Sequence, residues 1–402
     1  MHLVAATVVA LGMLWLPPAR LSAQQPVTRA EAVAAALTRG ARVALGRADT
    51  VAARGAVRTA RAFPNPTISA SYSRDLPNYH ALGELPLDLP WLRAPRIGAA
   101  ESARDATRYR FAFERAAIRF DVDTTYTRAL AAALHARLSQ RTALDADSLL
   151  KIAELRRAVG DVSELDVRLA AVNAGQLENI AAEDSLAAVR TLIVLQVQMG
   201  LPGEEAVITL VDSLVPPADS EPPAGRALLP IAAAEASLHS ADRSLAFARR
   251  SRLAPSLAFG FDTGDPTSPT PRQLLPVIGF SLPLPLFNWS GGEVMRAVAD
   301  RDRALAELDL TRRETTATLA QARRDLAAAH ARLRRSAVLV ESADRVVVMS
   351  LQAYREGAVA LENVLEAQRN AREILARYID DLAAADAAAR TVRLLTAGPD
   401  QP

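Results

Sequence analysis

The chain has 402 residues, of which 50% are hydrophobic but only 4% aromatic, and alanine supplies much of the apolar content, which argues against large compact cores. The net charge is +2 and the basic residues are nearly all arginine, with Lys151 the only lysine, which excludes a polybasic nucleic-acid-binding protein. Because cysteine is absent, disulfides, thiolate metal sites, thiol nucleophiles and lipid attachment through cysteine are excluded as well. We therefore expect long helices joined by a few segments rich in proline and glycine.

Residues 1–23 predict a secretory signal peptide. The run from Leu3 to Leu16 is apolar and has the length of a signal core, and Leu21-Ser22-Ala23 supplies small residues for cleavage before Gln24. The run is too short for a helix that spans a membrane, which needs about 20 apolar residues. The positively charged start of a typical signal is weak here, so an uncleaved anchor or an unstructured start is the alternative.

Residues 24–201 are predicted to form a first structural repeat. A helix from Thr28 to about Arg61 begins with a capping box of Thr28 and Glu31, and Pro64-Asn65-Pro66 ends it. Alternating apolar and polar residues then predict two strands, at 67–74 and at 85–91. A helix from Gly98 to Val159 follows, and at 1.5 Å per residue it would be roughly 90 Å long. Gly160 ends it, and Ser163 with Asp166 caps a return helix to about Met199.

Residues 226–398 are predicted to repeat this order, after a proline-rich linker at 202–225 and before a short tail at 399–402. A helix at 227–252 precedes two alternating segments, one around Phe259 and one at 278–286. A long helix then runs to Glu356, breaks at Gly357 and returns to about Thr396. The two breaking glycines are separated by nearly half the chain, which indicates an internal duplication.

Each predicted strand pair has one continuous apolar row opposite a polar or small row. The flanking helices are too long to fold over such short strands, so we expect the apolar rows to face lipid and the polar rows to face a lumen. Because open sheet edges are excluded from lipid and four strands cannot close a barrel, the chain must oligomerise. Three copies would supply twelve strands, and two copies would supply eight. The predicted lipid-facing positions are Leu85, Leu87, Leu89, Trp91, Ile278, Phe280, Leu282 and Leu284.

Several motifs resemble those of the TolC-type outer membrane efflux proteins, and especially their CzcC-like heavy-metal branch. The longest is Ile278-Gly279-Phe280-Ser281-Leu282-Pro283-Leu284-Pro285-Leu286-Phe287-Asn288, followed by Gly292-Glu293-Val294. Pro64-Asn65-Pro66-Thr67 precedes the first strand, and the two breaks read Gly160-Asp161-Val162-Ser163 and Gly357-Ala358-Val359-Ala360. Together these motifs extend the resemblance over about residues 27–398.

The resemblance implies a mainly α fold with a membrane β part. It implies a homotrimer, in which duplicated helical hairpins form a periplasmic tunnel and four strands per chain contribute to a twelve-stranded outer membrane barrel. It also implies a periplasmic adaptor protein, an inner membrane efflux pump and outer membrane lipid as partners, with no nucleic acid and no cofactor. Two features depart from the family: the missing cysteine excludes the lipid anchor of many relatives, and Ala360 lacks the cap that Ser163 provides.

The two helix breaks are the predicted adaptor-contacting tips, against the alternative of plain turns that contact nothing. The residues assigned to the tips are Gly160, Asp161, Val162, Gly357, Ala358 and Val359. Glu362 and Glu366 lie one helical turn apart and share a face, so three copies would form an acidic ring at the entrance. The alternative is a solvated helix face. Glu164 and Asp166 offer a parallel ring, although capping explains Asp166 better.

An enzyme and a metal-binding protein are both disfavoured. His80, His135, His239 and His330 fall in four separate segments without the spacing of a metal site, and no phosphate-binding loop, dinucleotide fingerprint or nucleophile motif occurs. The sequence therefore predicts a passive exit duct of a tripartite efflux system. The alternative is a periplasmic coiled-coil adaptor or interaction protein, which should have one hairpin where this sequence has two.

Overall fold

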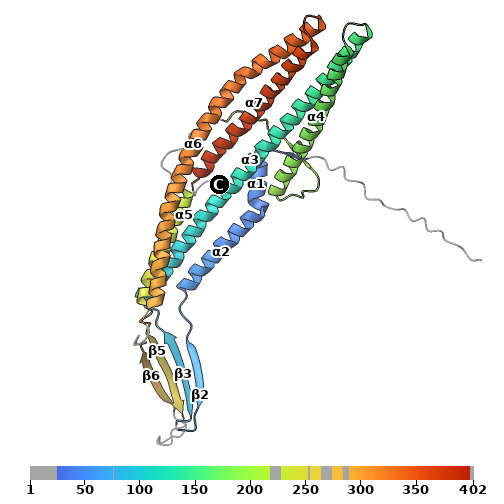
Figure 1. Ribbon diagram of the computed structural model, residues 1–402. Helices are drawn as coiled ribbons and strands as arrows, with labels where there is room; N and C mark the ends of the chain where they lie inside the picture. The colour runs from blue at the N-terminus through green and yellow to red at the C-terminus, as the bar shows by residue number, and fades with distance from the viewer. Residues whose placement is uncertain are drawn as a thin grey trace, which may run out of the picture.

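The protein is elongated, with a β-sheet at one end and the turns of two long helical hairpins at the other (Figure 1). The C-terminal end of the described chain lies about midway between them. The computed structural model describes residues 25–75, 77–217, 228–251, 254–263, 274–283 and 289–398. The predicted signal peptide and the tail at 399–402 lie outside the described residues.

The element order confirms the predicted duplication. The first repeat comprises α1 (Arg29–Arg39), α2 (Ala41–Arg61), β2 (Thr67–Tyr72), β3 (Tyr79–Pro86), α3 (Pro90–Ala158) and α4 (Glu164–Gln198). The second comprises α5 (Leu229–Arg250), β5 (Ser256–Thr263), β6 (Leu275–Ser281), α6 (Gly291–Arg355) and α7 (Leu361–Leu395). Two short strands, β1 (Gln25–Val27) and β4 (Ile208–Leu210), lie outside this pattern.

The first predicted helix is wrong in one respect, because Gly40 divides it into α1 and α2. The capping box at its start is present, with the backbone nitrogen of Thr28 donating to the Glu31 carboxylate at 2.8 Å. At Gly40 the backbone is extended, and a Cβ there would lie only 2.4 Å from the carbonyl oxygen of Ala36. Glycine is therefore required where the chain bends between the two helices.

The predicted strand at 85–91 is also wrong beyond Pro86. Leu85 lies in β3, but Leu87 and Leu89 lie in the connection that follows, where the amide of Leu89 donates to the carbonyl of Leu87 at 3.1 Å, and Trp91 lies in the first turn of α3. Pro90 suits the first turn of a helix, since the amide that it lacks has no helical partner there. A second proline, Pro95, cannot donate to the carbonyl of Trp91, and Arg250 of α5 donates to that oxygen instead at 3.4 Å.

The predicted linker includes a folded segment. Its strand β4 pairs in parallel with β1, and the side chain of Gln196, at the end of α4, is fully buried beneath it. The Gln196 amide donates to the carbonyl oxygens of Pro202 and Glu205 and accepts from the amide of Val207 at 2.7 Å. The hydrophobic core here joins α1, α3, α4 and the two short strands. This region is therefore a compact middle of the molecule.

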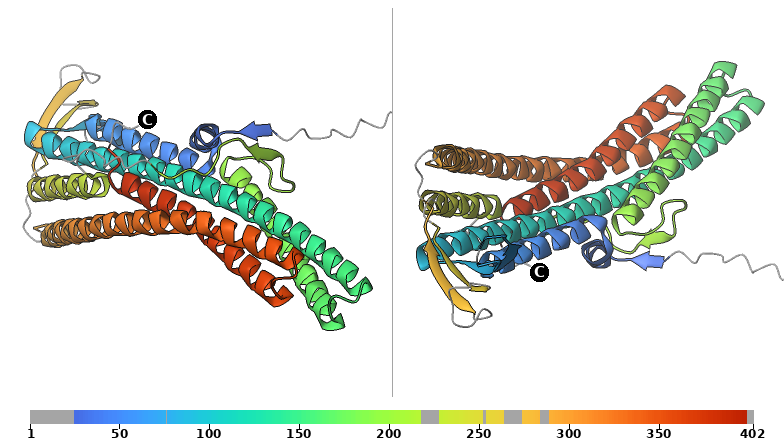
Figure 2. Two further views of the ribbon diagram at one scale, coloured as in Figure 1. Left: turned by 90° about the horizontal axis from the view of Figure 1, so that it is seen from above. Right: turned by 90° about the horizontal axis from the view of Figure 1, so that it is seen from below.

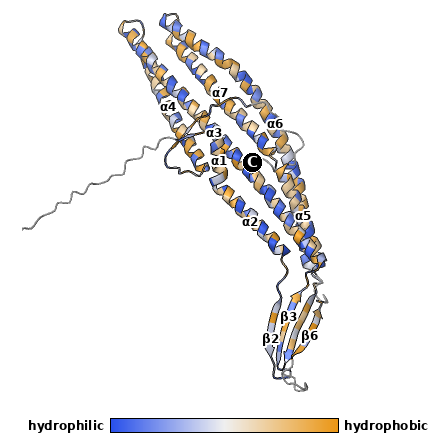
Figure 3. Ribbon diagram, turned by 180° about the vertical axis from the view of Figure 1, so that it is seen from behind, coloured by the Kyte–Doolittle hydropathy of each residue, from blue (hydrophilic) through white to orange (hydrophobic). Residues whose placement is uncertain are grey.

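The long hairpins pack through small side chains. Ala153 of α3 and Ala385 of α7 are fully buried, and Ala170 of α4 and Ala329 of α6 nearly so, so neighbouring helices approach closely. The hairpin α6–α7 lies alongside α3, with α5 between α3 and α6 in the half nearer the sheet (Figure 2). Hydrophilic and hydrophobic residues both occur along the whole length of the helices (Figure 3). These alanine contacts explain how an aromatic-poor chain forms stable long helices.

The main sheet joins the two repeats. Its strand order is β2-β3-β5-β6, with every neighbouring pair antiparallel, so β3 of the first repeat pairs with β5 of the second. Among the described residues, β2 and β6 each have a strand on one side only. The sheet is thus open at both edges.

Candidate functional site

The first hairpin turn is a helix-ending motif built around Gly160. Gly160 has a φ of +79°, its amide donates to the carbonyl of Arg157, and the amide of Asp161 donates to that of Arg156, both at 2.9 Å. These two bonds satisfy carbonyls that the end of α3 would otherwise leave unpaired. Ser163 and Asp166 then form the predicted capping box of α4. Asp166 is therefore used in capping, as expected.

The second turn repeats the first with different residues. Gly357 has a φ of +73°, its amide donates to Tyr354 at 3.0 Å, and the amide of Ala358 donates to Ala353 at 2.8 Å. The start of α7 differs, because Ala360 makes no side-chain capping bond. Of the predicted tip residues, Gly160, Asp161, Gly357 and Ala358 are exposed, and Val162 and Val359 are half-buried.

Gly160→Ala is expected to destabilise the first turn by about 1–2 kcal/mol, because alanine is strained at this positive φ. Space is not the cause, since a Cβ at Gly160 would meet no atom within 4 Å. Gly175→Ala is the matched control: it is an exposed glycine inside α4 with equally open surroundings and should gain about 0.5–1 kcal/mol. Chemical denaturation measures the free energy of unfolding of both variants. If alanine changed it in the same direction at both positions, the positive φ of Gly160 would not matter for stability.

Arg156 connects the two turns. Its Nη2 lies 2.6 Å from Oδ2 of Asp161, and its Nη1 donates to the backbone oxygen of Tyr354 at 3.0 Å. The guanidinium also covers the Tyr354 ring, 4.7 Å from the centroid. The hydrogen bond to Asp161 raises the pKa of Arg156. Around it, the buried residues Leu149, Ala153, Ala170, Tyr354, Leu361 and Val364 form one cluster, so the two tips are a single packed unit.

The acidic pair lies on the second hairpin just beyond this unit. Glu362 and Glu366 are both exposed on the first turns of α7. Glu366 accepts a hydrogen bond from Asn370 at 3.2 Å and lies 3.5 Å from Nη2 of Arg369. Glu164, at the corresponding place on the first hairpin, is paired with both Arg168 and Arg157, whose hydrogen bonds lower its pKa. Glu366 is thus paired with fewer arginines than Glu164.

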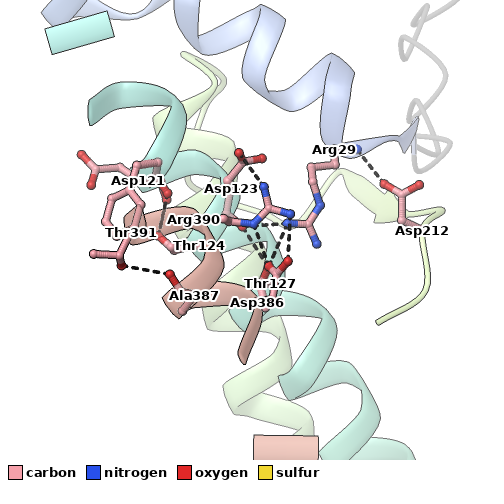
Figure 4. Close-up of polar contacts among 11 residues, drawn as sticks. Arg29, Asp121, Asp123, Thr124, Thr127, Asp212, Asp386, Ala387, Arg390 and Thr391 are labelled. Carbon is pink, nitrogen blue, oxygen red and sulfur yellow. Dashed lines mark hydrogen bonds and ion pairs between the residues drawn. The ribbon is translucent and has the colours of Figure 1, made fainter. Parts of the chain in front are cut away.

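A buried charge network that the sequence did not reveal lies where the second hairpin returns to the middle of the molecule (Figure 4). Arg390 of α7 binds Asp386 through Nε at 2.7 Å and Asp123 of α3 through Nη1, also at 2.7 Å. Arg29 of α1 lies 3.2 Å from Asp386, and Thr127 donates to the same carboxylate. The network therefore links α7 to both α3 and the first turn of α1.

The pKa values in this network follow from burial and pairing. The side chains of Asp123, Asp386 and Arg390 are only 8%, 10% and 14% exposed. Burial raises the pKa of Asp123 despite its attraction to Arg390 and Arg29. Burial opposes ionisation of Asp386 too, but hydrogen bonds from Arg390 and Thr127 outweigh it and lower its pKa. Arg390 is thus the positive group that favours the ionised form of both carboxylates.

The register of the main sheet separates an apolar face from a polar one. Ile68 opposes Gly83, Gly83 opposes Phe259, and Phe259 opposes Ile278, so these residues share one face of the four strands. Leu85, Leu257 and Phe280 are aligned on that face as well. Ile68 and Ile278 are each 82% exposed. Leu282 follows the end of β6, and Leu284 lies outside the described residues.

Polar residues connect the repeats on the opposite face. His80 Nδ1 lies 2.9 Å from Oδ1 of Asp262, and Ser256 donates to Glu84 at 2.6 Å, both between β3 and β5. Another histidine, His135, pairs with Asp380 across α3 and α7 at 2.9 Å. Within the described residues, histidines and carboxylates do not gather into a group of three or more suited to a metal ion. Nor do these residues include a helix both long and apolar enough to cross a membrane.

Comparison with known proteins gives consistent matches. Residues 229–398, the second repeat, match the family model described as outer membrane efflux protein. The cobalt-zinc-cadmium resistance protein CzcC of Cupriavidus metallidurans is 26% identical over 348 residues, covering 84% of this chain and 82% of that protein. This similarity therefore extends through both repeats.

Solved structures share the fold over nearly the whole chain. The CmeC outer membrane channel of Campylobacter jejuni matches with a TM-score of 0.79 at 15% identity, covering 93% of this chain and 87% of its own. The outer membrane protein VceC of Vibrio cholerae matches with a TM-score of 0.75 at 17% identity, covering 92% and 97% of the two chains. The arrangement of sheet and hairpins is thus shared with these proteins.

Proposed function

Because the chain belongs to the outer membrane efflux protein family, we propose that it is the outer membrane channel of a tripartite efflux system. It acts as a passive duct for small molecules or metal ions, which an inner membrane pump and a periplasmic adaptor supply. Its sheet lies in the outer membrane and its helical hairpins form a tunnel through the periplasm. The runner-up, a periplasmic adaptor, is disfavoured by the two hairpins and the single shared sheet.

The observation that carries this proposal is an open four-stranded sheet with one exposed apolar face, attached to two long hairpins. In lipid, the unpaired edges of β2 and β6 would each cost several kcal/mol per backbone group. Four strands are too few to close on themselves, whereas three copies supply twelve. The edge β2 of one copy and the edge β6 of the next run antiparallel, so a homotrimer closes the sheet without reversing a strand.

Membrane fractionation tests the proposal directly. The mature protein should be recovered in the outer membrane, as trimers that migrate above the monomer on gels before heating and convert to monomers after heating. Recovery as monomers in the soluble periplasmic fraction would contradict the duct and favour the adaptor or interaction protein. The first cargo to test is divalent metal cations, because the similar Cupriavidus metallidurans protein is a cobalt-zinc-cadmium resistance protein. A disruption strain should then lose metal resistance.

The packed tips are the proposed docking surface for the adaptor. Gly160, Asp161, Val162, Gly357, Ala358 and Val359 lie on the two turns that end the hairpins. Because Arg156 and the buried cluster join these turns, an adaptor would meet one firm surface. Cross-linking from Ala358→Cys to a purified adaptor tests this role, and the cysteine-free chain makes that thiol unique. Equal labelling from Gln321→Cys, midway along α6, would contradict it.

Glu362 and Glu366 are the proposed acidic gate. Replacing both with alanine should reduce the cation selectivity of single channels and raise their conductance, since three copies would remove six negative side chains from a narrow entrance. Glu341→Ala, which removes an exposed carboxylate from α6 paired with Arg345, is the control and should change neither property. If the double variant kept the cation selectivity of the original channel, Glu362 and Glu366 would simply lie on a solvated helix face and would not form a gate.

A further inference from the structure

A small cleft lies where α1, α3 and the end of α7 meet, beside the buried charge network. Its volume is about 40 Å³. A single water molecule needs about 10–15 Å³ of such space, so the cleft has room for about three waters or one compact ion. Leu37, Phe120 and Leu394 supply apolar parts of its wall, and Gly398, at the end of the described chain, lines it as well.

Four arginines also line this cleft. Arg115 and Arg119 lie about one turn apart on α3, so they share a face of that helix. Arg390 and Arg393 are related in the same way near the end of α7. Asp123 is the single carboxylate among the described residues that line the cleft. Cationic groups from two helices that are far apart in the sequence thus surround one small space.

The carboxylates closest to these arginines along α3 are already engaged by other groups. Asp123 binds Arg390 at 2.7 Å, within the buried network. Glu114 and Asp121 both bind Arg42 of α2, at 2.8 Å and 2.5 Å. The cleft therefore contains more positive charge than the carboxylates around it neutralise.

Arg115 and Arg393 are the two arginines of the cleft that lack a partner within the described part of the chain. Neither side chain makes a hydrogen bond or an ion pair with another residue there. Arg115 is half-buried, and a charge that is partly removed from water is costly without a partner. The negative end of the α7 dipole favours Arg393 in the last turn of that helix, but Arg115 lies well inside α3, where no helix end can stabilise it.

We propose that the cleft binds one compact oxyanion, a phosphate or a carboxylate, between Arg115 and Arg119 of α3 and Arg393 of α7. Guanidinium groups present planar pairs of N–H donors that match the oxygens of such an anion. The apolar part of the wall lowers the local dielectric constant, which strengthens the ion pairs. This site goes beyond the proposed duct function, because it needs neither a membrane nor a pump, and its ligand joins α3 to α7.

Two sources can supply the oxyanion. One is phosphate free in solution. The other is the side chain of Asp400, which lies outside the described residues and follows Gly398 by two positions, a span of at most about 7 Å. Both present carboxylate or phosphate oxygens to the same arginines. The variant Asp400→Asn distinguishes them, because it removes the charge of the chain's own carboxylate.

Calorimetric titration of the detergent-solubilised protein with inorganic phosphate tests the proposal, with sodium chloride holding the ionic strength constant. The test pair is Arg115→Gln with Arg393→Gln. The matched control pair is Arg128→Gln with Arg377→Gln, which removes the same charge from the same two helices at exposed positions outside the cleft. Both pairs are made in the original chain and in Asp400→Asn, and circular dichroism checks that each variant keeps its helices.

We expect one phosphate to bind per chain. The test pair should weaken this binding at least about tenfold, the usual effect of losing a charged hydrogen-bond partner, and the control pair less than about twofold. Binding by the original chain identifies free phosphate as the ligand, and binding only after Asp400→Asn identifies the chain's own carboxylate as the oxyanion. Absence of binding in both backgrounds, or equal weakening by the test and control pairs, would overturn the site.

Discussion

Arg390→Ala should lower the free energy of unfolding by about 3–5 kcal/mol, the usual cost of removing one partner from a buried ion pair. The substitution leaves Asp123 and Asp386 facing each other's charge in a site where both side chains are at most 10% exposed. Denaturation in detergent at one fixed protein concentration measures the loss, because the stability of an oligomer depends on concentration.

Two further variants define the cause of that loss. Arg393→Ala removes an exposed arginine from the last turn of α7 and should change stability by less than about 0.5 kcal/mol. Replacing Arg29, Asp123, Asp386 and Arg390 together with apolar residues of similar size should recover most of the stability, since no charge of the network then remains without a partner. If Arg390→Ala and Arg393→Ala behaved alike, the network would have no structural role.

Ile278→Arg should prevent stable insertion of the trimer, because an arginine at the middle of the lipid-facing surface costs about 2–4 kcal/mol. Three copies of the chain would incur that cost three times in one assembly. Val277→Arg is the matched control: it places the same side chain one residue away, on the polar face with Gly260 opposite, where a lumen can solvate it. Outer membrane fractions and gel mobility before heating measure the assembled trimer.

Failure of Ile278→Arg together with normal assembly of Val277→Arg is expected only if the apolar face meets lipid. Normal assembly of Ile278→Arg would contradict that orientation. Failure of Val277→Arg with normal Ile278→Arg would reverse it and place the polar face outward. Failure of both would contradict a water-filled lumen on the polar face.

Local signals in the sequence were enough to predict most of the elements. The capping boxes at Thr28 and Ser163 and the breaks at Gly160 and Gly357 each depend on residues within one helical turn, and all four are confirmed. Apolar residues alternate with proline and aspartate at 85–91 as they would in a strand, but Pro90 suits the first turn of a helix equally well. The local pattern therefore could not show whether the strand continues to residue 91 or a helix begins at Pro90.

The buried network could not be predicted in this way, because its partners are far apart along the chain. Thr127 and Asp386 are separated by 259 residues, and Arg29 and Asp386 by 357. Asp386 and Arg390 are four residues apart, a spacing that is as typical of a solvated helix face as of a buried one. Only the packing of α7 against α3 decides which of the two applies.

The pairing of β3 with β5 also determines the order of folding. His80 and Asp262, which meet across these strands, are 182 residues apart, so a large part of the chain must be made before the sheet can form. Until then the hairpin of β2 and β3 has an unpaired edge and an exposed apolar face, and two strands alone are barely stable in water. Strand pairing over such a separation is slow and favours aggregation of the waiting chain. The first repeat therefore presents this edge and apolar face to other chains until the second repeat is available to pair with it.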